Sequence, residues 1–152
     1  MNTLSLPAKA VHFLPHDFPM VFIDRLLEAD GERGLCELLL TSAHIFVDAQ
    51  GRMDRACYVE IAAQSFAAVK GWKLACKGAL FSSGFLVGVQ AFECLDDART
   101  GDLLQIETIE LGGFDGYTVV RATINRGGET IAGGKIKLYV PASEIQNPGA
   151  DA

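Results

Sequence analysis

Hydrophobic and polar residues alternate along much of the chain, and this pattern predicts extended strands on both sides of one helical segment. Two apolar runs, 21–28 and 34–41, flank an Asp30-Gly31 turn signal, which predicts an antiparallel hairpin. Four further strands are expected over 85–95, 103–112, 116–125 and 130–140, because short segments rich in glycine and aspartate separate them. We predict that these four strands form a meander.

One segment, ACYVEIAAQSFAAVKGW at 56–72, has the composition of a helix. It is rich in alanine, contains no proline, and would form a helix about 25 Å long. Before Val69 only Glu60, Gln64 and Ser65 are polar, so the helix is apolar on nearly every side and is expected to be buried. Asp54 is the expected N-cap.

The predicted elements follow the order of two strands, one buried helix and four strands. A curved antiparallel sheet of about six strands wrapped around one long helix is an α+β arrangement, the hot-dog fold. The length predicts a single domain over 1–152, with an irregular arm at 1–20 that contains about one helical turn, and a frayed tail at 142–152. A sheet of this kind has an edge strand that needs covering, so we expect a dimer.

Charge and cysteine content exclude several classes of protein. The net charge of −6 and the lack of any basic run argue against nucleic-acid binding, and no apolar stretch is long enough to span a membrane. We therefore expect a cytoplasmic protein. The four cysteines form no CxxC pair, so free and mostly buried thiols are expected in preference to disulfides, with no metal site and no cofactor.

Glu60 is the first candidate for chemistry, because it lies on a helix with hardly any polar face. A carboxyl group in such a place can act as a general acid or base if a polar group nearby orients the substrate. Gln64 lies one turn further along the helix and could provide that group. The alternative is that the two residues mark a thin solvent-facing stripe and have no catalytic role.

Three histidines, His12, His16 and His44, are candidates for the complementary acid or base. His16 lies in the segment LPHDFPM, where a proline on each side restricts the backbone. His44 lies in the loop that leads into the helix and could fold back beside Glu60. His12 has only its proximity to His16 in its favour.

Gly84 and Gly88, in the segment GFLVG, are candidates for substrate contact. They do not belong to a phosphate-binding loop, because no lysine with serine or threonine ends the segment and no helix follows it. In an extended segment they indicate a close backbone approach or a bulge. In a hot-dog fold, small residues at this point could leave room for an acyl-pantetheine tunnel.

Two segments, LPHDFPMVFIDRL at 14–26 and VEIAAQ at 59–64, resemble the beta-hydroxyacyl-ACP dehydratases. In that family the N-terminal segment reads LPH-x-x-P, and the central helix carries a glutamate in an E-x-x-A-Q setting. The chain is most similar to dehydratase-like proteins of aryl-polyene gene clusters. These share the LPHDxPM opening, a D-x-x-G loop like residues 48–51 here, and a GFL-x-G strand.

The resemblance implies a dimer in which a histidine and a glutamate from opposite subunits share one site. That site removes water from a β-hydroxyacyl thioester held on the phosphopantetheine of acyl carrier protein. Glu60 matches the glutamate of the family. The histidine of the family lies in a GHFPG segment that this chain lacks, and Phe46 stands at the corresponding distance. Either His16 or His44 could supply the imidazole, and the LPHDFPM motif favours His16.

Three functions follow as hypotheses. The first is a lyase in which Glu60 protonates the leaving hydroxyl, a histidine removes the α-proton, and backbone amides near the helix start polarise the thioester. The second is an acyl thioesterase, and the third is a non-catalytic or supporting subunit paired with another hot-dog chain. Lys70, Lys73 and Lys77, at helical spacing, could form a basic patch for the acidic carrier protein, or could only be a solvated helix end.

Overall fold

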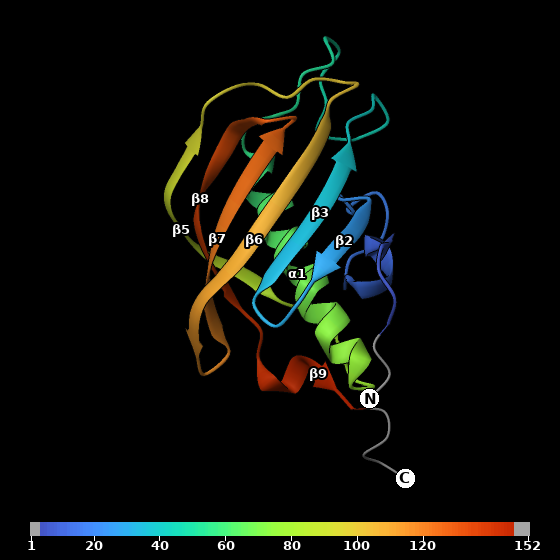
Figure 1. Ribbon diagram of the computed structural model, residues 1–152, viewed down its shortest axis with the longest axis vertical. Helices are drawn as coiled ribbons and strands as arrows, with labels where there is room; N and C mark the ends of the chain where they lie inside the picture. The colour runs from blue at the N-terminus through green and yellow to red at the C-terminus, as the bar shows by residue number, and fades with distance from the viewer. Residues whose placement is uncertain (1–3, 148–152) are drawn as a thin grey trace.

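The computed structural model describes residues 4–147, and its centre is one long helix against one large antiparallel sheet (Figure 1). The elements are β1 (Ala8–Lys9), the 3₁₀ helix η1 (Ala10–Phe13), β2 (Arg25–Ala29), β3 (Arg33–Leu39), α1 (Cys57–Cys76), β4 (Leu80–Phe81), β5 (Phe85–Cys94), β6 (Leu103–Phe114), β7 (Tyr117–Arg126), β8 (Glu129–Tyr139), the 3₁₀ helix η2 (Ala142–Glu144) and β9 (Ile145–Gln146). This is the expected α+β hot-dog arrangement.

The order of the strands differs from the predicted meander. The large sheet has seven strands in the order β1-β2-β3-β6-β7-β8-β5. The hairpin of β2 and β3 is confirmed, and β6, β7 and β8 do form a meander. β5 instead pairs with β8 at the edge, and the chain then crosses the end of the sheet to place β6 beside β3 (Figure 1). Periodicity predicts strands but carries no information about their order, which explains the difference.

Helix α1 ends four residues later than predicted and is buried along most of its length. Tyr58, Ile61 and Ala62 have no exposed surface. Burial of a large apolar side chain contributes about 1.5–3 kcal/mol, so this face of the helix is a main source of stability. Gly71 lets η1 pack directly on the helix, because a Cβ atom at Gly71 would lie 1.9 Å from the carbonyl oxygen of Phe13.

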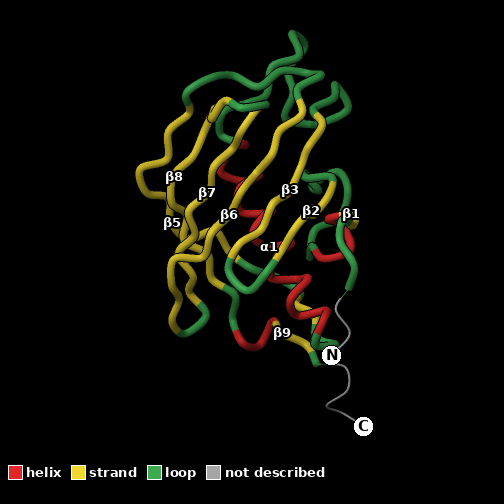
Figure 2. The backbone as a smooth tube through the Cα atoms, viewed as in Figure 1, coloured by secondary structure: helices red, strands yellow, loops and turns green. Residues whose placement is uncertain are grey.

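The two ends of the chain are more regular than expected. The N-terminal arm contains the predicted helical turn as η1 and also contributes β1, which pairs with β2. Within the predicted tail, residues 142–146 form η2 and β9, and β9 pairs with β4 beside the end of α1 (Figure 2). The rest of that predicted tail, at 148–152, lies outside the described residues.

All four cysteines are free, as predicted, but only Cys36 is fully buried. Within residues 4–147 no group of histidine, cysteine, aspartate or glutamate side chains could hold a metal ion. Among the same residues, no helix is both long enough and apolar enough to cross a membrane.

Candidate functional site

A small cavity of about 70 Å³ lies between α1 and the sheet, and it contains several of the predicted site residues. His16, Glu60, Gln64 and Gly84 all line it. Eleven other residues line the cavity, and of these only Lys70 was a candidate in the sequence analysis. They are Pro15, Ala63, Phe66, Ala67, Lys70, Phe81, Phe85, Leu86, Thr118, Leu138 and Val140. The cavity therefore joins the N-terminal arm, the helix and the β5 end of the sheet.

His16 and Glu60 face each other in this cavity. The Nε2 atom of His16 lies 3.7 Å from the Oε1 atom of Glu60, and the two side chains are 31% and 35% exposed. The separation exceeds a hydrogen bond, and partial exposure leaves the pair accessible. Nδ1 of His16 is buried and has no hydrogen-bond partner among the described residues. Both groups come from one chain, unlike the arrangement between subunits that the resemblance implies.

Gln64 connects Glu60 to the N-terminal arm. Its Nε2 donates to Oε1 of Glu60 at 3.0 Å and to the carbonyl oxygen of Met20 at 2.8 Å. Its Oε1 accepts the Phe22 amide at 2.8 Å. Only this orientation of the amide satisfies all three partners, since the backbone N–H requires an acceptor and the carbonyl requires a donor. Gln64 is fully buried, so it holds the arm that carries His16 against the helix that carries Glu60.

His44 lies outside this cavity. Its Nδ1 is 3.1 Å from the Thr41 amide nitrogen, and its ring packs on Phe46 with centroids 5.0 Å apart. Phe46, at the position that corresponds to the family histidine, is buried and packs on Phe22 with centroids 4.5 Å apart. Within one chain the structure thus brings His16, and not His44, to Glu60. His12 is exposed in η1 and does not line the cavity.

The two candidate glycines have different surroundings. Gly84 lines the cavity, and a Cβ atom there would lie 3.1 Å from Cγ2 of Val140, which indicates a tight approach to the residue that follows β8. Gly88 does not line the cavity, and a Cβ atom there would make an ordinary contact at 3.4 Å with Lys137. It lies at the irregularity between β5 and β8 that follows Leu86, which agrees with the expected bulge.

The first amides of the helix are already used within the protein. The prediction that Asp54 is the N-cap is wrong, because the N-cap of α1 is Ala56 and it makes no side-chain cap hydrogen bond. Asp54 instead closes the turn before the helix, where its Oδ1 accepts the Ala56 amide at 2.9 Å and its carbonyl oxygen accepts the Cys57 amide at 3.0 Å. The Tyr58 amide donates to the carbonyl oxygen of Arg55. These three amides are therefore not free to polarise a thioester carbonyl, contrary to the expectation.

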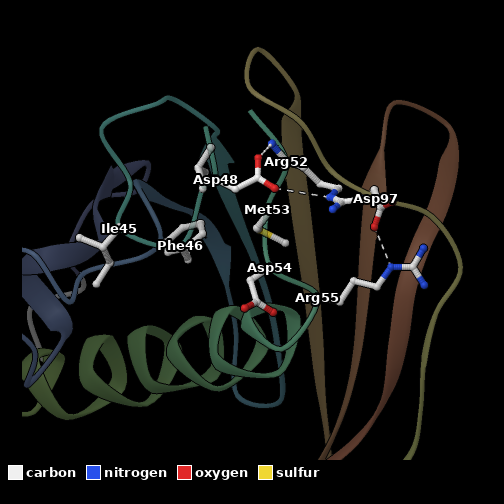
Figure 3. Close-up of a pocket in the computed structure, with 9 residues that line it drawn as sticks. Ile45, Phe46, Asp48, Arg52, Met53, Asp54, Arg55 and Asp97 are labelled. Carbon is white, nitrogen blue, oxygen red and sulfur yellow. Dashed lines mark hydrogen bonds and ion pairs between the residues drawn. The ribbon is translucent and has the colours of Figure 1, made fainter. Parts of the chain in front are cut away.

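A larger, open hollow of about 660 Å³ lies at the N-terminal end of α1 (Figure 3). Two arginines and two aspartates that line it form ion pairs, with Arg55 Nε 2.7 Å from Asp97 Oδ1 and Arg52 Nε 3.6 Å from Asp48 Oδ2. The hydrogen bond and positive charge of Arg55 lower the pKa of Asp97. Paired, ionised groups of this kind suit a structural role, so the smaller cavity with the His16–Glu60 pair is the better candidate.

Comparison with known proteins identifies the family of this chain. The sequence matches the ApeP-like family, described as ApeP dehydratase, over residues 8–148. The chain belongs to this dehydratase family. The match confirms the resemblance to the dehydratase-like proteins of aryl-polyene clusters. No curated protein matches the sequence.

Solved structures show the same fold. The dehydratase heterocomplex ApeI:P from Xenorhabdus doucetiae matches with a TM-score of 0.84 and 22% identity, over 93% of this chain and 95% of that chain. A sigma28-regulated virulence protein from Campylobacter jejuni matches with a TM-score of 0.64 and 15% identity, over 88% and 87%. A hypothetical thioesterase with coenzyme A from Streptococcus pneumoniae matches with a TM-score of 0.58 and 11% identity, over 76% and 83%.

Proposed function

We propose that this member of the ApeP-like family is a hydro-lyase that removes water from β-hydroxyacyl thioesters in fatty-acid or polyene-type biosynthesis. Its substrate would be carried on the phosphopantetheine of acyl carrier protein. The observation that carries the proposal is the separation of 3.7 Å between His16 Nε2 and Glu60 Oε1 in one cavity. An imidazole and a carboxyl group at that separation can act on neighbouring carbon atoms of one substrate.

In the proposed reaction, neutral His16 takes the α-proton at Nε2, and the electrons of the C–H bond form the α,β double bond. The C–O bond at the β-carbon breaks, and protonated Glu60 gives its proton to the leaving oxygen, so that water departs. His16 is then protonated and Glu60 is a carboxylate. Transfer of the proton from His16 to Glu60 restores both groups. Gln64 is a positioning residue, since its amide is already bonded to three protein groups.

We also propose that a second hot-dog chain completes the site. The cavity of about 70 Å³ is well below the roughly 300–1,000 Å³ of pockets that enclose small-molecule ligands, so it is too small for an acyl chain. Phe85 and Leu86 line it from the edge strand β5, where they are 50% and 39% exposed. A chain that paired with β5 would cover these apolar side chains and extend the wall of the cavity. The ApeI:P heterocomplex supports an unlike partner, and a second copy of this chain is the alternative.

The test is a dehydration assay on β-hydroxyacyl thioesters of acyl carrier protein, with the chain alone and with a second hot-dog chain. Glu60→Gln and His16→Ala should each slow formation of the enoyl thioester by about 100-fold or more. Glu28→Gln and His12→Ala are matched controls, because both residues are exposed and lie outside the cavity. His44→Ala shows whether the second candidate histidine contributes.

Each alternative has its own outcome. Free thiol in place of enoyl thioester would identify a thioesterase. Turnover that needs the second chain and survives Glu60→Gln and His16→Ala would identify a supporting subunit without catalytic groups. Either result would overturn the proposed role of the pair.

A further inference from the structure

Two lysines of α1 and the lysine that follows its last residue line one small cavity, on a protein whose net charge is −6. Lys70, Lys73 and Lys77 line this cavity of about 130 Å³ together with Glu110 of β6. One of the three donors of Lys73 Nζ bonds the carbonyl oxygen of Gly31 at 2.7 Å. Three ammonium groups and one carboxylate leave a local excess of positive charge, so the cavity suits an anion.

Lys70 is half-buried in this cavity. Burial is the main cause that lowers its pKa, the carboxylate of Glu110 opposes the effect, and the positive charges of Lys73 and Lys77 add to it. A half-buried ammonium group beside two others gains more from an incoming anion than an isolated surface lysine does, because less water screens it.

The lysine cavity adjoins the candidate active site. Phe66 and Lys70 line both cavities. Along the helix, Glu60 is ten residues from Lys70 and 17 residues from Lys77, which correspond to about 15 Å and about 25 Å at the rise of an α-helix. An extended ligand could therefore place an anion among the lysines and its reacting atoms beside Glu60.

We propose that Lys70, Lys73 and Lys77 bind the phosphate of the phosphopantetheine arm that carries the acyl group. The inference rests on the proposed function for the identity of the arm. The arm has its anionic phosphate at one end and its thioester at the other, which matches the order of the lysine cavity and the His16–Glu60 pair. Ammonium groups bind phosphate through charge-assisted hydrogen bonds.

The direct test compares binding of 4′-phosphopantetheine with that of pantetheine, which differ only in the phosphate. The variant carries Lys70→Gln, Lys73→Gln and Lys77→Gln, and the control carries Lys9→Gln and Lys135→Gln, two lysines outside both cavities. Wild type and control should bind phosphopantetheine more tightly than pantetheine, by about tenfold or more for one charge-assisted hydrogen bond. The triple variant should lose this preference, and added salt should reduce it in the wild type.

Kinetics separate the phosphate from other sources of affinity. In the triple variant, KM for carrier-bound and coenzyme A-bound substrates should rise by a larger factor than KM for an N-acetylcysteamine thioester, which has no phosphate. An effect on carrier-bound substrate alone would overturn the inference, because the lysines would then contact the carrier protein itself. Equal binding of phosphopantetheine and pantetheine to the wild type would also overturn it.

Two further readouts keep the result interpretable. Lys77 is exposed, so Lys77→Gln alone should fold normally and lose part of the preference for phosphate even if the triple variant is unstable. The binding experiment needs no turnover. A phosphate preference in a protein that dehydrates nothing would refute the proposed function and leave the phosphate site standing, whereas turnover without that preference would do the reverse.

Discussion

Nε2 of His16 lies 3.7 Å from Oε1 of Glu60, although the two residues belong to segments 44 positions apart in the chain. Gln64 bridges these segments through hydrogen bonds to Glu60 and to the backbone at Met20 and Phe22. A pair formed within one chain differs from a pair assembled between subunits, because its geometry does not depend on association. A partner can then shape the acyl site without supplying the acid or the base.

His16 and Glu60 should behave as one catalytic unit. We expect Glu60→Gln and His16→Ala each to lower kcat by about 10²- to 10⁴-fold, the usual contribution of general acid–base catalysis. The double variant should be no slower than the worse single variant, because each loss already disables the same proton transfers. The measurement is kcat for the four proteins on one thioester. Losses that multiply in the double variant would contradict a shared role.

Gln64 should be needed for both stability and turnover. Gln64→Leu leaves the buried Phe22 amide without an acceptor, which should lower the free energy of unfolding by about 1–3 kcal/mol. It also frees the arm that holds His16, so kcat should fall while KM changes little. Urea unfolding and steady-state kinetics measure the two effects.

Ser65→Ala is the matched control for Gln64. Ser65 is also fully buried on α1, but its hydroxyl donates only to the carbonyl oxygen of Ile61 within the same helix. This variant should keep kcat close to that of the wild type. An unchanged kcat in Gln64→Leu would show that Gln64 does not position the catalytic pair.

The sequence predicted those parts of the site that show a pattern within one short segment. The helix of alanine and apolar residues predicted a buried segment with Glu60 and Gln64 on it, and the LPHDFPM motif singled out His16. The contacts of Gln64 with Met20 and Phe22 could not be predicted, because they join residues 44 and 42 positions apart. Only the path of the arm across the helix brings these residues together.

The same pattern could not predict the order of the strands in the sheet. β5 pairs with β8, and β6 pairs with β3, so the chain crosses the sheet after Cys94. The alternation of apolar and polar residues within a strand is the same whichever strand lies beside it, so this pattern does not identify the neighbouring strand. The short pairing of Ile145 with Phe81 was missed for a related reason, since two-residue strands are too short to show alternation.

Stability should fall in alkali because of Tyr58 and Cys36. Burial raises the pKa of Tyr58 to about 12, and burial likewise raises the pKa of Cys36 to about 12. Above their ordinary values of 10.0 and 9.0 the unfolded chain has lost these protons while the folded chain keeps them. The unfolded state then binds fewer protons, so the free energy of unfolding decreases as pH rises and the contribution is lost through pH 12.

The alkaline effect is measured by urea unfolding at pH 8, 10 and 11. Tyr58 should account for a loss of about 1.4 kcal/mol by pH 11, because that pH lies one unit above its ordinary pKa of 10.0 and each unit is worth 1.36 kcal/mol. Tyr58→Phe should lower the free energy of unfolding by about 1 kcal/mol at pH 8, because the hydroxyl donates to the Asp96 carbonyl oxygen. It should also flatten the decline above pH 10. An equally steep decline in Tyr58→Phe would refute the assignment.

The exposed edge of β5 should be where a second chain binds. Val89 lies on this strand and is 52% exposed, and a lysine there would have to be buried without a partner if another strand paired alongside. Because an unpaired buried charge costs about 3 kcal/mol or more, Val89→Lys should weaken association by about 100-fold or more. Leu103→Lys is the matched control, because Leu103 is 49% exposed but lies on β6, inside the sheet.

Sedimentation velocity at several concentrations, with the chain alone and with an unlike hot-dog partner, measures both variants. If Val89→Lys associates as the wild type does, the partner does not pair along β5, and the cavity beside Phe85 and Leu86 must be completed in another way.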